Sequence, residues 1–272
     1  MKQKLFFQSS LPRAGSTLLQ NIVGHNPDFY VSPTSGLVDL MLGTRIGYND
    51  NPESKASTPE EWQAGFLGYC KAGFDGYMQA LTDKPYFFDK SRAWGPYYSL
   101  TKMIIPNPKV VFMVRDFRAI YSSMEKLFRK SPDVDPKIMN NIDMTGITTD
   151  QRVTHWANTH PVGFTITKLH QCILDGTAKN FLFFKYEDFC QYPDEHMKTL
   201  YKFFELPYYQ HDWNNIQQIT HENDAVHGIF GDHTIRNKLQ AQKEDFYQIL
   251  GNYTCDRIKN EYKWFYDYFQ YQ

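Results

Sequence analysis

Residues 5–19 read Leu5-Phe6-Phe7-Gln8-Ser9-Ser10-Leu11-Pro12-Arg13-Ala14-Gly15-Ser16-Thr17-Leu18-Leu19. The apolar run from Lys4 to Phe7 predicts a short buried strand. Pro12 and Gly15 then mark a turn, and the apolar spacing after Ser16 predicts a helix that begins there. A strand that turns sharply into a helix points backbone N–H groups and the positive end of the helix dipole at one place. The stretch therefore predicts an anion-binding turn.

The cation of this turn stands at a different position from the lysine of a nucleoside-triphosphate P-loop. The P-loop pattern G-x-x-x-x-G-K-S/T, laid on Ser10 to Thr17, puts Ser16 at the lysine position. A cation comes earlier, at Arg13. The turn is thus predicted to bind a phosphate-like group without the P-loop lysine.

The composition of the 272-residue chain limits its possible partners. A net charge of −1 argues against nucleic acid or an anionic membrane surface as the main partner. The four cysteines form no Cys-x-x-Cys pair, so neither a disulfide framework nor a zinc site is indicated. No apolar run approaches about 20 residues, and the first strand leaves no room for a signal peptide. If the sequence is complete, we expect a cytoplasmic protein with no membrane segment; a trimmed chain could have lost an anchor.

Predicted strands and helices alternate along the chain. Strands are expected at 29–31, 85–88, 109–114 and 180–185, helices at 59–81, 150–175, 194–205 and 242–269, and a long loop or lid at 131–150. Such alternation is typical of an α/β fold in three layers, with a central parallel sheet and helices on both faces. With no linker or internal repeat in view, we expect one domain over residues 1–272.

Polar residues follow the predicted strands at their carboxyl ends, where ligands bind in such sheets. Arg13 follows the first strand, Asp89-Lys90-Ser91-Arg92 a later one, Arg115 the next and Tyr186 the last. We therefore expect these side chains to converge on one site.

A second anion motif begins at Arg115. Ser123 lies eight residues further on, and two helical turns span about 7 residues, so the hydroxyl can lie on the same side as the helix entry. Arginine offers a forked cation to a phosphate, and the hydroxyl a second donor. The alternative is that Arg115 and Asp116 pair with each other and cap the helix.

The two motifs together resemble those of sulfotransferases that use 3′-phosphoadenosine 5′-phosphosulfate (PAPS). Pro12 to Thr17 is similar to the loop that binds the 5′-phosphosulfate, and Arg115 to Ser123 is similar to the 3′-phosphate motif R-D-x-R-A-x-x-x-S. Tyr186-Glu187-Asp188 and Gly231 to Arg236 also fit the family pattern. The resemblance implies the P-loop NTPase-like sulfotransferase fold, PAPS as co-substrate and adenosine 3′,5′-bisphosphate as product.

The resemblance also implies roles for individual residues. The residues expected to bind PAPS are Arg13, Ala14, Gly15, Ser16, Thr17, Leu18, Arg115, Ser123, Tyr186 and Arg236. Arg13 would contact the bridging oxygen, where negative charge develops as the S–O bond breaks. Lys90 corresponds to a family lysine near the transferring sulfuryl group. For Arg13 a structural role is the alternative, and for Tyr186 it is core packing.

The general base is left open by the sequence. Cytosolic sulfotransferases have a histidine two positions after the lysine, but this chain has Arg92, which cannot accept a proton. Other sulfotransferases use a glutamate after the first loop; the carboxylate in that range is Asp39, with Asp89 as the second candidate. Each could equally be a helix cap or an ion-pair partner. His155 and His160 are further candidates.

A cluster of histidines late in the chain raises the question of a metal site. It comprises His221, His227 and His233, together with Asp224 and Asp232. Their spacing matches no common ligand pattern, and the reaction implied by the resemblance needs no metal. We therefore expect none.

The leading functional prediction is transfer of a sulfuryl group from PAPS to an acceptor hydroxyl or amine. Small molecules, sugars and peptides all remain possible acceptors, and the oligomeric state is not predicted. An ATP-dependent P-loop kinase is one alternative, although the missing lysine argues against it. A non-catalytic nucleotide-binding module is the other.

Overall fold

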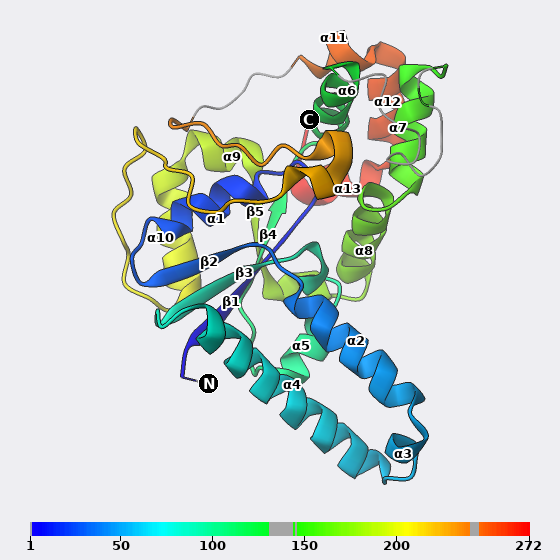
Figure 1. The fold of residues 1–272 in the computed structure, drawn as a ribbon. Coiled ribbons are helices and arrows are strands. Elements are labelled where there is room, and N and C mark those ends of the chain that lie inside the picture. The colour runs from blue at the N-terminus through cyan, green and yellow to red at the C-terminus, as the bar shows by residue number, and fades with distance from the viewer. Residues whose placement is uncertain (1, 131–143, 145, 240–244) are drawn as a thin grey trace.

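The computed structural model describes residues 2–130, 144, 146–239 and 245–272. Its strands are β1 (Lys4–Ser10), β2 (Phe29–Thr34), β3 (Tyr86–Lys90), β4 (Val110–Val114) and β5 (Phe181–Lys185). They form one five-stranded sheet in the order β2-β3-β1-β4-β5, and every neighbouring pair is parallel. The predicted α/β fold with a central parallel sheet is therefore confirmed (Figure 1).

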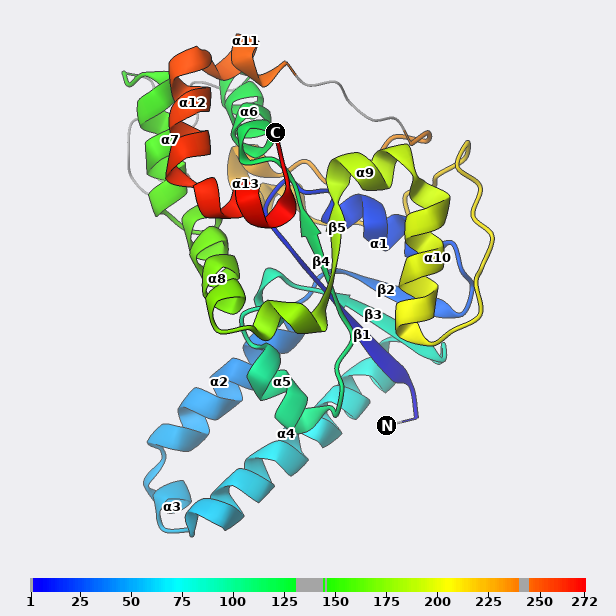
Figure 2. The ribbon, with the colours of Figure 1, turned by 180° about the vertical axis from the view of Figure 1, so that it is seen from behind.

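The helices lie on both faces of this sheet (Figures 1 and 2). They are α1 (Ser16–Gly24), α2 (Leu37–Asp50), α3 (Pro52–Lys55), α4 (Pro59–Leu81), α5 (Tyr98–Ile104), α6 (Phe117–Lys130), α7 (Thr149–Asn158), α8 (Val162–Leu174), α9 (Tyr186–Gln191), α10 (Pro193–Phe204), α11 (Phe246–Leu250), α12 (Asn252–Glu261) and α13 (Lys263–Phe269). Short 3-10 turns are η1 (Arg92–Trp94), η3 (Thr177–Asn180) and η4 (Asp224–Phe230).

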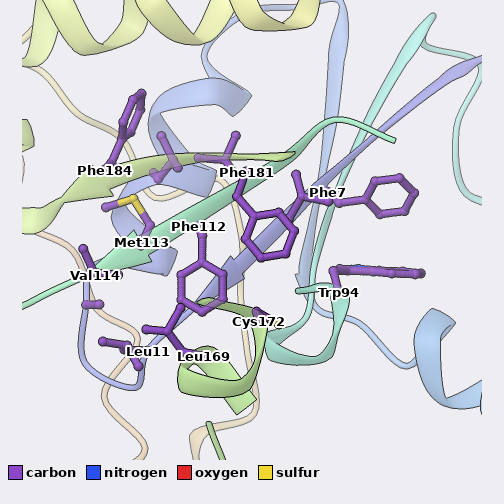
Figure 3. Close-up of a cluster of buried hydrophobic side chains, with 14 of the residues drawn as sticks. Phe7, Leu11, Trp94, Phe112, Met113, Val114, Leu169, Cys172, Phe181 and Phe184 are labelled. Atoms are coloured by element: carbon purple, nitrogen blue, oxygen red, sulfur yellow. The ribbon is translucent and has the colours of Figure 1, made fainter. Parts of the chain in front are cut away.

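Adjacent phenylalanines of β1 show how the sheet is buried on two sides. Successive side chains of a strand point to opposite faces. Phe6 stacks on Phe204 of α10, with ring centroids 4.1 Å apart, whereas Phe7 packs on Trp94, at 4.5 Å. Figure 3 shows the Phe7 face, where Phe112 and Leu169 join the same apolar cluster. The continuous apolar runs of the strands are explained by this double coverage.

Two predicted helices are wrong in their extent. The helix predicted over 150–175 is split into α7 and α8, because Pro161 has no backbone N–H and cannot continue a helix. The helix predicted over 242–269 is split as well: Gly251, at φ 81°, separates α11 from α12. Most of the predicted loop or lid over 131–150, and residues 242–244, lie outside the described residues.

The helices α2, α3 and α4 extend together away from the sheet (Figures 1 and 2). α4 begins at a capping box between Thr58 and Glu61, with Pro59 in its first turn. Phe66 and Phe74 are buried and lie on the face of this helix that packs on the rest of the protein. In the described part of the chain, no helix has the length and apolarity needed to cross a membrane.

Candidate active site

A cavity of about 1010 Å³ lies at the carboxyl ends of the strands, where the sequence predicts a site. Its lining includes Arg13, Gly15, Ser16, Thr17, Leu18, Arg115, Ser123, Tyr186 and Arg236. These residues come from the turn after β1 and the start of α1, from the end of β4 and from α6, from the start of α9 and from the segment after η4. The structure therefore brings together nine of the ten residues predicted to bind PAPS; Ala14 is buried beside them.

The turn after β1 depends on backbone conformations that are uncommon for most residues. Arg13 has φ 58° and Gly15 has φ 83°. The side-chain amide of Gln8 donates a hydrogen bond to the carbonyl of Ser16 at 3.1 Å and so ties the strand to the helix start. Gly15 also lies against the ring of Tyr186: a Cβ atom there would be 2.5 Å from its Cδ2. Glycine is therefore required both by φ and by space.

The two anion motifs are in direct contact. Nη1 of Arg115 donates to the carbonyl of Arg13 at 2.7 Å, and its guanidinium lies 4.5 Å from the centroid of the Tyr186 ring. Nε of Arg13 donates to Oγ of Ser123 at 3.2 Å. The Asp116 carboxylate, in contrast, makes its closest contact with Arg118, at 2.6 Å. Two stretches about a hundred positions apart thus form one cationic surface.

The comparison with known proteins agrees with this geometry. A family model described as the sulfotransferase family matches residues 6–211. The chain belongs to the sulfotransferase family. No curated protein sequence gives a significant match.

Solved structures of sulfotransferases resemble this sulfotransferase over nearly its whole length. The sulfotransferase domain from the curacin biosynthetic pathway is 16% identical, with a TM-score of 0.55 over 97% of this chain and 98% of that chain. The domain from the Synechococcus PCC 7002 olefin synthase is 17% identical (TM-score 0.45; 96% and 95% covered). A Mycobacterium avium sulfotransferase is 11% identical, with a TM-score of 0.47 over 96% of this chain and 76% of that chain. At 16% identity, the similarity to the curacin pathway domain supports the fold of this chain and nothing further.

Lys90 connects the first loop of this sulfotransferase to a carboxylate that the sequence analysis missed. Its Nζ donates to Oγ1 of Thr17 at 3.3 Å and forms an ion pair with Glu222. Thr34 donates to the other Glu222 oxygen at 2.7 Å. Burial lowers the pKa of Lys90, against the opposing effect of Glu222. Burial would raise the pKa of Glu222, but Lys90, together with Thr34 and His233, outweighs burial and holds this pKa below its ordinary value.

Two histidines of the late cluster also line the cavity, His227 and His233. Nδ1 of His233 is bonded to the Asp224 carboxylate, and its Nε2 is 3.4 Å from Oε2 of Glu222. His227 Nε2 lies 3.6 Å from the same oxygen. One ligand atom from each of these histidines and from Glu222 lies within 4.8 Å of the others. The Lys90 ammonium on Glu222 opposes a divalent cation there, because like charges repel strongly in a buried site.

The candidate bases differ in their access to the cavity. His155 and His160 line it, whereas Asp39 and Asp89 are not among the described residues that do. Asp39 is exposed near the start of α2. Asp89 is 0% exposed and accepts a hydrogen bond from Nε1 of Trp94 at 2.7 Å. Neither carboxylate therefore belongs to the described cavity lining, and their catalytic role stays a prediction.

The burial of Asp89 leads us to expect that the free energy of unfolding depends on pH. Burial raises its pKa to about 6, although donors from Ser35, Trp94 and Ser32 work against this. The folded protein thus holds this proton more tightly than the unfolded chain. The stabilisation is fully present below the ordinary carboxyl pKa near 3.8 and is lost as the pH rises through about 6. It should amount to something on the order of 3 kcal/mol.

The Asp89→Asn variant should lack this dependence. Urea unfolding of both proteins at several pH values between 4 and 7 would measure it, with Asp39→Asn as the control for loss of an exposed carboxylate. A difference between wild type and Asp89→Asn that stays constant over this range would contradict the prediction.

Proposed function

We propose that this sulfotransferase moves a sulfuryl group from PAPS to an acceptor hydroxyl or amine and releases adenosine 3′,5′-bisphosphate. One observation carries the proposal: the contact of Arg115 and Ser123 with Arg13. PAPS bears anionic groups at both ends of one nucleoside, so a binding protein needs two cationic sites on one cavity. A site for a single phosphate would not need the second motif.

The proposed roles follow from the positions of the groups. Backbone N–H groups of residues 14–18, at the start of α1, would bind the 5′-phosphosulfate. Arg115, Ser123 and Arg236 would bind the 3′-phosphate. Tyr186, packed on Gly15, would contact the adenine side.

Arg13 lines the cavity, and Lys90 is buried behind the first loop in contact with Thr17. Both would supply positive charge at the reacting group. As the bond between sulfur and the bridging oxygen breaks, negative charge develops on the departing phosphate, and a fixed cation stabilises it. Both residues contact carboxylates of the same late segment, Asp232 and Glu222. The donor would have to compete with these carboxylates for the two cations.

Binding and transfer can be tested separately. Calorimetry would measure binding of adenosine 3′,5′-bisphosphate, with ATP and Mg²⁺ for comparison. A transfer assay with PAPS would cover alcohols, phenols, sugars and tyrosine peptides. The absence of bisphosphate binding at millimolar concentration would overturn the proposal. Binding that survives Arg13→Ala, with no turnover on any acceptor in either form, would indicate a non-catalytic module.

The finer sequence predictions are part of the same proposal. Residues 1–272 would form one sulfotransferase domain, and the contacts of the first loop with Asp232 support this. The acceptor would be a small molecule, a sugar or a peptide rather than nucleic acid or a membrane. A cytoplasmic location stays a prediction.

Gly15→Ala should weaken bisphosphate binding. The new Cβ would displace the Tyr186 ring, and an L-residue at this φ costs about 1–2 kcal/mol. If this cost falls on the conformation of the loop that binds the ligand, the bisphosphate affinity should fall by about tenfold. Gly176→Ala is a matched control, because Gly176 also has positive φ, 75°, but nothing lies within 4 Å of its Cβ position. Equal bisphosphate affinity in the two variants would contradict the prediction.

A further inference from the structure

Sulfuryl transfer to a hydroxyl requires a group that accepts the hydroxyl proton. Arg92 cannot accept one, and neither Asp39 nor Asp89 is among the described residues that line the cavity. His155 and His160, the other candidates, do line the cavity, but among the described residues no carboxylate contacts either ring to fix its orientation, as Asp224 does for His233. The sequence therefore leaves the base unassigned. The inference below rests on the proposed function.

Asp224 fixes the orientation of the His233 side chain. One carboxylate oxygen binds Nδ1 of the ring, and the other accepts from the backbone N–H of His233 at 3.4 Å. A neutral imidazole that donates its Nδ1 proton keeps a lone pair on Nε2. That nitrogen faces Glu222, and the His233 side chain lines the cavity with 15% of its surface exposed. A base held by a carboxylate at its second nitrogen is a recurrent catalytic arrangement.

We propose that His233 is the general base of the transfer and that Asp224 is its positioning residue. The late segment thus supplies the function that Arg92 cannot provide at the usual family position.

A chain of contacts links this base to the first loop. Nε2 of His233 is 3.4 Å from Glu222, Glu222 is paired with Lys90, and Lys90 donates to Thr17 at 3.3 Å. Thr17 lies where the 5′-phosphosulfate would bind. Glu222 and Lys90 are buried between the proposed base and the first loop, whereas His233 and Thr17 both line the cavity. An acceptor hydroxyl would therefore reach both of them from the cavity.

The charges around His233 suit a group that becomes positive during the reaction. The titratable and charged groups facing it or its neighbours are Asp224, Glu222, His227, Lys90 and Arg92. The two carboxylates contact the ring directly and would stabilise the imidazolium. Lys90 binds Oε1 of Glu222, the carboxylate oxygen that does not face His233. The ammonium group therefore partly neutralises the negative charge next to His233.

The step can be written in full. The acceptor oxygen forms a bond to sulfur while the bond from sulfur to the bridging oxygen breaks. The electron pair of the broken bond leaves with the 5′-phosphate, next to Arg13. The acceptor proton moves to Nε2 of His233 and later to solvent. The products are a sulfate ester and adenosine 3′,5′-bisphosphate, and no oxidant or reductant is required.

His227 is the closest rival, since its ring centroid is 4.9 Å from that of His233. Its Nε2 faces Glu222, but among the described residues it is His233, and not His227, that has a carboxylate on Nδ1. Without that contact the ring is not fixed in one tautomer. We assign His227 no catalytic role.

The test compares His233→Gln, Asp224→Asn and His227→Gln in the full chain. His233→Gln should lower kcat by about 10²–10⁴-fold and remove the acid limb of the kcat profile. Bisphosphate affinity, measured by calorimetry, should change by less than about threefold. Asp224→Asn should lower kcat less and displace the acid limb. His227→Gln should lose less than about tenfold in kcat.

The outcomes separate this inference from the proposed function. If the wild-type protein neither binds the bisphosphate nor transfers the sulfuryl group, the proposed function fails. If it turns over, but His233→Gln keeps kcat and its pH profile, the base assignment is overturned. A larger loss in His227→Gln overturns it as well. So does one tightly bound zinc ion whose chelation abolishes turnover, because the cluster would then be a metal site.

Discussion

Arg115→Ala is expected to weaken binding of adenosine 3′,5′-bisphosphate by about 10²–10³-fold. The residue has two tasks in the proposed complex. Its fork would bind the 3′-phosphate, and a hydrogen bond to a charged group contributes about 1.5–3 kcal/mol. Its Nη1 also holds the carbonyl of Arg13 at 2.7 Å, so the first loop loses a support when Arg115 is removed. Calorimetry on the purified variant would measure the affinity.

A second ligand separates these two tasks. Adenosine 5′-phosphate lacks the 3′-phosphate, so Arg115→Ala should affect its binding only through the loop and by a smaller factor. Arg115→Lys keeps the charge but loses the forked geometry, and should recover part of the bisphosphate affinity. Arg45→Ala removes an exposed arginine of α2 and should change neither affinity. An equal loss for both ligands in Arg115→Ala would show that the residue acts through the loop alone.

The sequence was most informative where a pattern is local. The apolar run of β4 and the turn before Ser16 each have a short-range signature, and the sheet and the first loop follow from them. The order of polar residues after successive strands then predicted which side chains meet, because carboxyl ends of parallel strands share one edge. Arg13, Arg115 and Tyr186 do line one cavity.

Glu222 and the contact of Asp224 with His233 could not be predicted in this way. They belong to a segment whose position is set by contacts between distant residues. The Asn21 side chain, for example, accepts from the backbone N–H of Thr220 at 2.8 Å. No periodicity encodes such a contact. The one available signal was the clustering of histidines and carboxylates, which suggests a metal site as readily as a base.

The breaks in the long helices could have been predicted more easily from the sequence. Pro161 and Gly251 interrupt apolar patterns that otherwise continue, and both residue types are known helix breakers. A pattern of apolar residues reports which face is buried, and two helices in succession can bury the same face. The apolar period therefore continued through both breaks, while the backbone did not.

Arg13→Ala should lower kcat by about 10²–10³-fold, as does removal of other groups that stabilise charge in a transition state. Bisphosphate affinity should fall far less, because the charge that Arg13 is proposed to stabilise develops on the bridging oxygen during transfer. Initial rates with PAPS and a responsive acceptor, alongside calorimetry, would measure the two effects. A large loss of bisphosphate affinity at unchanged kcat would contradict the assignment.

The backbone conformation of Arg13 offers a further control. At φ 58° the residue is left-handed, a conformation that costs an L-residue about 1–2 kcal/mol and glycine nearly nothing. Arg13→Gly therefore removes the guanidinium and fits the turn without strain, whereas Arg13→Ala keeps the strain. If the missing charge causes the loss, both variants are slow and Arg13→Lys recovers part of the rate. If a distorted loop causes it, Arg13→Gly should approach the wild-type kcat, and the proposed role of the guanidinium would have to be abandoned.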